Sequence, residues 1–293
     1  LTLFWLKKIP QRIDLAIGMN CFDTLALVIG KRFKKIDRLV FFNTDFSRQR
    51  FVNPILNKVY VLADRFAAKK ADFLCCNTKR TIQIRTKEGI KRDKIIYAPN
   101  GVFLKKIGSI NRIKPFRPQL VYVGHLGAGH DLSKVILALK GTKFKLFIIG
   151  SGPSQKCLEN LTRKNQLEKQ VTFLGSMSHQ KVFNYLKSFA GFGLAPYSQA
   201  YNWTYYADPV KVKEYLACLL PVIVSDIPQI AEEITKKNLG FSYKNDKELR
   251  AIIKRAAEMK QDDYQKIIQN IKKIRKSLSL NAIYQKILKS VLV

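Results

Sequence analysis

Short apolar runs alternate with amphipathic segments along the whole chain. The apolar runs have the length of strands, and the segments between them place apolar residues every three or four positions, as helices with one buried face do. The runs that we expect to be strands are 13–17, 39–42, 72–76, 94–98, 119–123, 145–149, 171–174, 192–195 and 222–224. The alternation predicts an α/β fold with parallel sheets, because a connecting helix lets successive strands run in the same direction.

Helices are expected between these strands and after the last of them. The clearest ranges are 24–30, 58–71, 79–88, 131–139, 180–189, 208–219, 247–260, 262–278 and 281–293, with a further helix that ends at Asn165. A polar, proline-containing stretch over residues 105–118 is typical of a linker. We therefore expect one domain over residues 1–114 and a second over residues 115–280.

Composition describes a folded protein without a membrane-spanning or secretory segment. The 293 residues are 47% hydrophobic and 11% aromatic, which is enough for a large core. The longest apolar run is far shorter than the roughly 20 residues that span a bilayer. The five cysteines are odd in number and lack metal or redox spacing, so a reduced, cytoplasmic protein is expected. Three scattered histidines predict no metal site.

The net charge of +32 is large, and it is densest in residues 1–118. A basic surface attracts polyanions, which include phospholipid head groups, nucleic acids and phosphorylated substrates. A general bias of the genome toward lysine is the other explanation, and the sequence leaves both open.

The most informative segment is residues 208–228. Asp208 is expected to cap a helix whose first position is Pro209, and an all-apolar strand follows the helix. Lys211 and Glu214 lie three residues apart and are therefore neighbours on one edge of this helix. A helix N-terminus with a lysine and a carboxylate can hold a phosphate and a sugar diol together. An exposed ion pair between Lys211 and Glu214 is the alternative.

This segment resembles the signature of the group 1 (family 4) glycosyltransferases, which have the GT-B fold. The matching residues are Pro209, Lys211, Val212, Glu214, Tyr215, Leu216, Ala217, Pro221, Val222, Ser225 and Asp226. The resemblance covers residues 119–293 and, more loosely, 37–104. It implies two Rossmann-like domains with parallel sheets that face each other across a cleft, and a last helix, 281–293, that crosses back to the first domain. Family members begin with a strand and a glycine-rich loop that we do not find, so the N-terminal domain is expected to be incomplete.

The resemblance also implies a binding site for the sugar donor. Glycines end three successive strands, where a missing side chain lets the backbone approach a diphosphate or simply permits a tight turn. The backbone near residues 173–175 would bind the nucleobase, the start of the signature helix the diphosphate, and Glu214 the ribose. The residues expected to bind the donor are Gly124, His125, Gly150, Gly152, Phe173, Leu174, Gly175, Pro209, Val210, Lys211 and Glu214.

The chain departs from the family pattern at several positions. Tyr206 stands eight residues before Glu214, where many members have a second glutamate. The loop over residues 124–130 contains neither Arg nor Lys, and Leu219 replaces a glycine at the end of the signature helix. Asp45 is a candidate general base by position only.

The sequence predicts a glycosyltransferase that moves a sugar from a nucleotide-diphosphate donor to a hydroxyl acceptor in cell-surface glycan or glycolipid synthesis. By resemblance it transfers a hexose with retention and needs no cofactor beyond the nucleotide sugar as co-substrate. A cytoplasmic location, with docking to an anionic membrane surface, fits the charge. A non-catalytic relative that binds a nucleotide or a partner is one alternative. A basic nucleic-acid-binding protein is another, although no helix-turn-helix, RNP or zinc-finger pattern is found.

Overall fold

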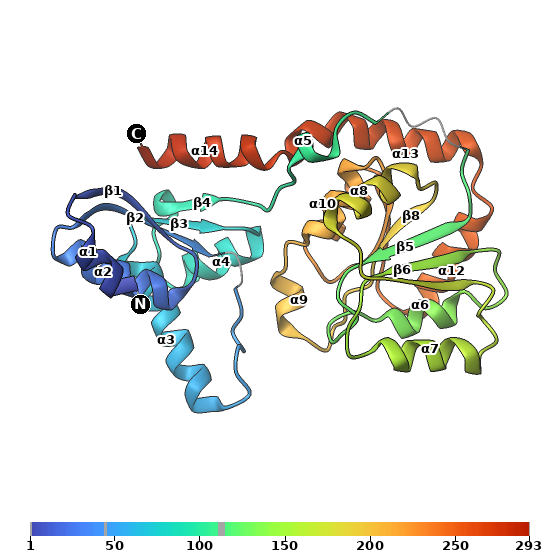
Figure 1. Ribbon diagram of the computed structural model, residues 1–293, viewed down its shortest axis with the longest axis horizontal. Coiled ribbons are helices and arrows are strands. Elements are labelled where there is room, and N and C mark those ends of the chain that lie inside the picture. Colours follow the sequence, from blue (N-terminus) through green and yellow to red (C-terminus); the bar gives the residue numbers. More distant parts are fainter. Residues whose placement is uncertain (1, 44–45, 111–114, 293) are drawn as a thin grey trace. The chain divides into compact units, whose positions relative to one another are not determined.

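The computed structural model describes residues 2–43, 46–110 and 115–292, which form two compact units (Figure 1). The first unit comprises Leu1–Asn100, Tyr205–Asp208 and Ile283–Val293. The second comprises Gly101–Thr204 and Pro209–Ala282. Each unit contains one parallel sheet, so the predicted α/β class is confirmed.

The first unit has a four-stranded parallel sheet with the strand order β1-β2-β3-β4. Its strands are β1 (Ile13–Gly18), β2 (Ile36–Asn43), β3 (Phe73–Cys76) and β4 (Ile95–Tyr97). Its helices are α1 (Thr2–Lys8), α2 (Cys21–Arg32), α3 (Pro54–Lys70), α4 (Lys79–Lys87), the short 3-10 helix η1 (Arg92–Lys94) and most of α14 (Leu280–Leu292).

Both faces of this sheet are covered, because its central strands are apolar on both sides. Leu39 and Phe41 of β2 belong to a buried cluster that includes residues of α2 and α3. Phe42, next to Phe41 and on the opposite face, belongs to a second cluster with Ile287 and Val291 of α14. A helix from the far end of the described chain therefore completes the core of the first unit.

The second unit has a six-stranded parallel sheet with the order β10-β9-β8-β5-β6-β7. Its strands are β5 (Gln119–Val123), β6 (Lys145–Ile149), β7 (Val171–Gly175), β8 (Phe192–Ala195), β9 (Val222–Ser225) and β10 (Gly240–Tyr243). The chain runs outward from β5 to β7 and then returns to β8 on the other side of β5. This reversal makes the carboxyl ends of β5 and β8 the topological switch point, where ligands of such sheets bind.

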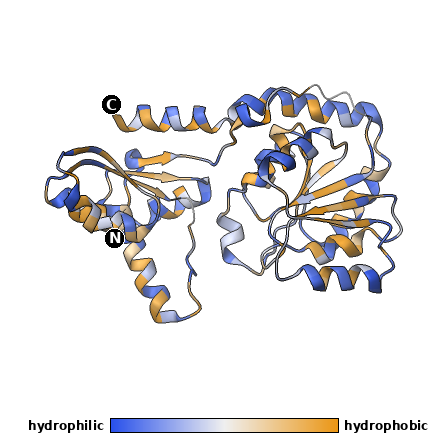
Figure 2. Ribbon diagram, in the orientation of Figure 1, coloured by the Kyte–Doolittle hydropathy of each residue, from blue (hydrophilic) through white to orange (hydrophobic). Residues whose placement is uncertain are grey.

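Helices flank both faces of the second sheet (Figure 1). They are α6 (Leu132–Ala138), α7 (Gln155–Lys164), α8 (His179–Ser188), α10 (Val210–Ala217), α11 (Ile230–Lys236), α12 (Asp246–Ala257) and α13 (Gln261–Ile274), with shorter turns at α5 (Leu104–Ile107), η2 (Arg275–Leu278) and the start of α9 (Asn202–Tyr206), whose last two residues belong to the first unit. The strands of both sheets are mainly hydrophobic (Figure 2), and in the second unit they supply most of one large buried cluster. Within the described residues, no helix is long and apolar enough to cross a bilayer.

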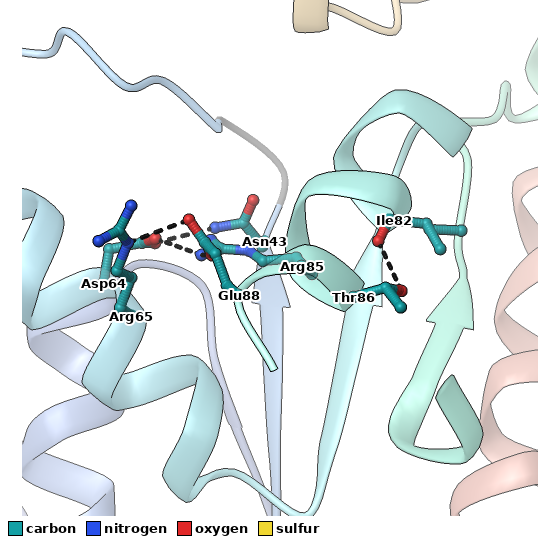
Figure 3. A network of polar contacts seen from close by, with 7 residues as sticks. All are labelled: Asn43, Asp64, Arg65, Ile82, Arg85, Thr86 and Glu88. Carbon is teal, nitrogen blue, oxygen red and sulfur yellow. Dashed lines mark hydrogen bonds and ion pairs between the residues drawn. The ribbon is translucent and has the colours of Figure 1, made fainter. Parts of the chain in front are cut away.

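A buried charge network joins α3 and α4 in the first unit (Figure 3). The Arg85 side chain is fully buried, and its Nη1 lies 2.6 Å from Asp64 Oδ2 and 3.0 Å from Glu88 Oε2. Asn43, at the end of β2, donates to Asp64 Oδ1 at 3.3 Å. The Arg85 guanidinium also lies 4.7 Å from the ring centroid of Phe46. Two acids therefore neutralise one buried cation beneath the carboxyl edge of the first sheet.

Candidate functional site

Helix α10 is held at the switch point of the second sheet by Tyr215. The Tyr215 hydroxyl accepts a hydrogen bond from the amide of Val123 at 2.8 Å and donates to the carbonyl oxygen of Leu194 at 3.3 Å. These two residues belong to β5 and β8, the two strands at the reversal. A Cβ on Gly193 would lie 2.4 Å from the Tyr215 ring, so glycine makes room for it. The signature tyrosine therefore fixes α10 against the edge where a ligand is expected.

The end of α10 keeps the backbone geometry of the usual glycine although Leu219 stands there. Leu219 has φ +57, and the amide of Leu220 bonds the carbonyl oxygen of Tyr215 at 2.9 Å, which is the pattern of a Schellman motif. The Leu219 side chain is buried in the core. Packing of this side chain offsets the strain of the left-handed conformation.

The start of α10 corrects the prediction for Asp208. Pro209 is the N-cap residue, and Val210 is the first residue of the helix. The Asp208 carboxylate instead accepts a hydrogen bond from the amide of Asn100 at 2.6 Å, and Asn100 Nδ2 donates to the Asp208 carbonyl oxygen, also at 2.6 Å. Asp208 therefore holds Asn100 within the first unit. The prediction was wrong because an acid before a proline fits a cap and a turn equally well by sequence.

Lys211 lies in the first turn of α10 among aromatic rings and close to Gly124. Its Nζ lies 3.2 Å from the Tyr122 hydroxyl and 3.5 Å from His130 Nε2. The ring centroids of Tyr122 and Tyr197 are 4.3 Å and 5.6 Å from the same ammonium. A Cβ on Gly124 would come within 2.8 Å of Nζ, so glycine is needed at the end of β5 for the lysine to lie there.

Burial changes the protonation of this cluster. Desolvation lowers the pKa of Lys211 to about 7, and the nearby Glu214 carboxylate offsets only part of that effect. Desolvation, with the charge of Lys211 and then His125, lowers the pKa of His130 to about 3. His130 is therefore neutral near pH 7, and Lys211 is poised to take up a proton when an anion arrives.

Glu214 lies one helical turn further along α10 and bonds His179 rather than Lys211. Glu214 Oε1 is 2.7 Å from His179 Nε2, and the carboxylate side chain is 13% exposed against 61% for the histidine. The exposed-ion-pair alternative from the sequence is therefore wrong. The mostly buried carboxylate keeps a second oxygen for another partner, as a ribose diol would require.

Two of the strand-end glycines serve contacts between loops. A Cβ on Gly150 would lie 1.9 Å from the Gly124 carbonyl oxygen, and one on Gly152 would lie 2.4 Å from the Leu126 carbonyl oxygen. The loops after β5 and β6 therefore touch through their backbones at these points. The predicted contact of Gly150 and Gly152 with a donor stays a prediction.

Gly175, at the end of β7, faces open space. Its φ is +68, and a Cβ built there would meet no atom within 4 Å. Ser176 donates from its hydroxyl to Ser151 Oγ at 2.8 Å, so two polar side chains border this space. Half-buried Phe173 and Leu174 precede it. This surface is free to receive a planar group, and its predicted contact with a nucleobase stays a prediction.

The remaining predicted residues lie apart from the Lys211 cluster. The exposed His125 ring folds over Gly127, and only its backbone oxygen joins the cluster, by accepting from the Tyr122 hydroxyl at 2.8 Å. Tyr206 packs edge-to-face on Phe46 in the first unit, with ring centroids 5.0 Å apart. Asp45 lies outside the described residues.

Sequence reasoning missed the side chains that surround Lys211 and Glu214. Tyr122 lies within a strand, Tyr197 within an aromatic loop, and His179 at the start of α8. Their distances from α10 along the chain leave no local signal, because only the strand order brings them together. In the described part of the chain, no three His, Cys, Asp or Glu side chains are grouped so that they could hold a metal ion.

Comparison with known proteins identifies the family of this chain. The model for the C-terminal domain of glucosyltransferase 3-like proteins matches residues 121–291, which include α10, nearly all of α14 and all of the second sheet except the start of β5. The chain belongs to the glucosyltransferase 3-like family. No curated protein matches its sequence. The predicted GT-B glycosyltransferase is thereby confirmed.

Solved structures share the fold at low sequence identity. Anabaena HepE in complex with UDP has a TM-score of 0.75 and 16% identity, with 94% of this chain and 78% of that chain covered. The lipopolysaccharide outer core galactosyltransferase WaaB has a TM-score of 0.68 and 19% identity, with 97% of this chain and 78% of that chain covered. Sucrose-phosphate synthase from Thermosynechococcus elongatus has a TM-score of 0.74 and 15% identity, with 94% of this chain and 72% of that chain covered. The GT-B fold predicted for this glucosyltransferase 3-like chain is confirmed by these matches.

Proposed function

We propose that this glucosyltransferase 3-like protein transfers a hexose from a UDP-sugar to a hydroxyl group of a cell-surface glycan. The observation that carries the proposal is the placement of Lys211 and Glu214 on the first two turns of α10, with Lys211 beside the Gly124 backbone. A lysine and a helix N-terminus attract a diphosphate, and a carboxylate suits a ribose diol. The UDP in the HepE structure supports uracil as the base, and WaaB, a galactosyltransferase, supports a hexose.

In the proposed reaction the hexosyl–phosphate bond breaks, the acceptor oxygen forms the new bond to the sugar, and the acceptor proton passes to the departing nucleoside diphosphate. The positive charge at α10 would stabilise the departing diphosphate. No resident cofactor is proposed, and the nucleotide sugar acts as a co-substrate. Retention of configuration is carried by the family resemblance alone, and its test is the anomeric form of the product by NMR.

Replacing Glu214 by alanine should weaken UDP-glucose binding about tenfold and leave the fold intact. A hydrogen bond to a charged group contributes about 1.5–3 kcal/mol, but the carboxylate must first release His179, so we expect the lower end of this range. Isothermal calorimetry in the presence of EDTA measures the affinity without a contribution from metal ions.

The exposed Glu168 provides the matched control, because Glu168→Ala removes the same charge from the second unit away from α10. An unchanged affinity in Glu214→Ala would remove Glu214 from the donor site. Binding without release of UDP on addition of glycan acceptors would favour the non-catalytic alternative.

We also propose that the protein works in the cytoplasm at an anionic membrane surface. Phe4 and Trp5 on α1 are each 56% exposed, and Phe33, in a lysine-rich turn, is 78% exposed. Aromatic side chains beside lysines suit a lipid head-group region. In vesicle sedimentation at low salt, the protein should bind anionic vesicles more strongly than neutral ones, and Phe4→Ala/Trp5→Ala should release it. Equal binding to anionic and neutral vesicles would mean that the high net charge reflects amino-acid composition and does not serve membrane docking.

A further inference from the structure

A cavity of about 510 Å³ opens at the carboxyl ends of β8, β9 and β10 in the second unit. It is lined by the loops that follow these strands and by the first turns of α6 and α12. Neither Lys211 nor Glu214 lines it. Its size lies within the range of small-molecule sites, which is roughly 300–1,000 Å³.

Ser225, the last residue of β9, lines this cavity. The side chain is 3% exposed, and its Oγ makes no hydrogen bond among the described residues. Ser225 does not cap the next helix, because α11 begins at Ile230 with Gln229 as its N-cap residue. A buried hydroxyl that neither caps a helix nor bonds a neighbour is costly to leave unpaired, and a ligand can supply the missing partner.

The cavity presents acceptors and donors in near balance. Lys134 Nζ lies 3.2 Å from Asp131 Oδ2 and 3.6 Å from Asp246 Oδ1, so one lysine bridges the carboxylates of two helix starts. The exposed Lys244 and Lys247 and the Gln199 amide add donors, so the lining holds two carboxylates and three lysines. A neutral ligand rich in hydroxyl groups can bond both signs of charge.

Part of the wall is apolar and suits the C–H faces of a sugar ring. The buried side chains of Tyr197 and Tyr243 and the side chain of Ile227 contribute there. A sugar fits all four features of the cavity: its volume, its two carboxylates, its unpartnered hydroxyl and its apolar wall. We propose that the cavity is a second carbohydrate site, which binds a free hexose or the hexose unit of a short glycan.

This site adjoins the Lys211 cluster and shares the Tyr197 ring with it, but its charged groups and Ser225 are different. The loop from Gly124 to Asp131 borders both, and its far end is held by hydrogen bonds from the Asp131 amide to the Pro196 carbonyl oxygen at 2.7 Å and from the Ser198 amide to the Gly129 carbonyl oxygen at 2.9 Å. Tyr197, which lines the cavity, lies with its ring centroid 4.9 Å from that of His130. Because the polar groups are separate, UDP should not compete with a sugar for the cavity.

Saturation-transfer NMR with glucose, galactose, N-acetylglucosamine and maltose tests the proposal. At least one of these sugars should bind the wild-type protein in the presence of saturating UDP. Ser225→Ala should weaken that sugar about three- to tenfold, which corresponds to one neutral hydrogen bond. Asp246→Asn, which keeps the shape of the side chain, should weaken it similarly.

Two readouts separate this proposal from the donor site and from a purely structural role. The UDP affinity and the thermal midpoint of Ser225→Ala should equal those of the wild type, and Ser242→Ala on β10, outside the cavity lining, should leave sugar binding unchanged. Displacement of the sugar by UDP, or undiminished sugar binding in Ser225→Ala, would overturn the proposal. Failure of UDP-glucose to bind while the sugars bind would reject the proposed transfer reaction alone.

Discussion

Replacing Arg85 by methionine should lower the free energy of unfolding of the first unit by about 3–5 kcal/mol, the range for breaking a buried ion pair by removing one partner. The substitution leaves the carboxylates of Asp64 and Glu88 in a buried place without their shared cation. Because the chain has two units, hydrogen exchange of the β2 and β3 amides should be followed rather than one global transition.

Two comparisons sharpen that result. Lys87→Met removes an exposed cation from the same helix and should change exchange in the first unit by less than about 0.5 kcal/mol. Adding Asp64→Asn and Glu88→Gln to Arg85→Met should restore much of the loss, because no buried charge of the network remains and the Arg65 partner of Glu88 is exposed to solvent. If Arg85→Met alone lowered the free energy of unfolding by less than about 1 kcal/mol, the network would contribute no more than exposed surface ion pairs do.

The affinity for UDP-glucose should fall as the pH rises from 7 to 9, by a factor that approaches about tenfold per unit. The pKa of Lys211 is about 7 in the free protein, and a bound diphosphate favours the charged form, so binding takes up a proton. UDP-glucose suits the measurement because its diphosphate diester loses no proton in this range. Lys211→Met should lower the affinity about ten- to a hundredfold at pH 7 and remove the slope.

The sign of the stability effect separates this loss from unfolding. The pKa of Lys211 in the folded protein lies below its ordinary value of 10.5, so the unfolded chain binds more protons between these values. Lys211 therefore makes the unliganded fold more stable as the pH rises from 7 to 9. Lys169→Met, at an exposed position, should keep the wild-type pH slope. A wild-type affinity that does not change with pH would contradict an uncharged or half-charged Lys211.

The strands that the sequence predicted best are those buried on both faces. Val222–Ser225 is apolar at three successive positions, and a short run of that kind is typical of a strand that is buried on both faces. Strand β10 (Gly240–Tyr243) was missed because Ser242 interrupts its apolar pattern and the strand is at the edge of the sheet. Helix α11 was missed because the seven residues Ile230–Lys236 span only two turns.

The donor site was predictable only where its residues are neighbours in sequence. Lys211 and Glu214 share one helix, so their spacing alone placed them together. Tyr122 is 89 residues from Lys211, and His179 is 35 residues from Glu214, so strand order rather than local pattern unites them. The Arg85 network was missed for another reason. Its acids and its arginine look like ordinary surface charges until the packing of α3 on the sheet buries them.

The helix that covers one face of the first sheet has a consequence for synthesis of the protein. The ribosome makes the whole second unit before it makes Ile287 and Val291, which pack against Phe42 and Cys75. The nascent first unit therefore exposes an apolar sheet face to water, and to chaperones, while the second unit is being made. Folding of the first unit can finish only after α14 has been made, although its strands are made before those of the second unit.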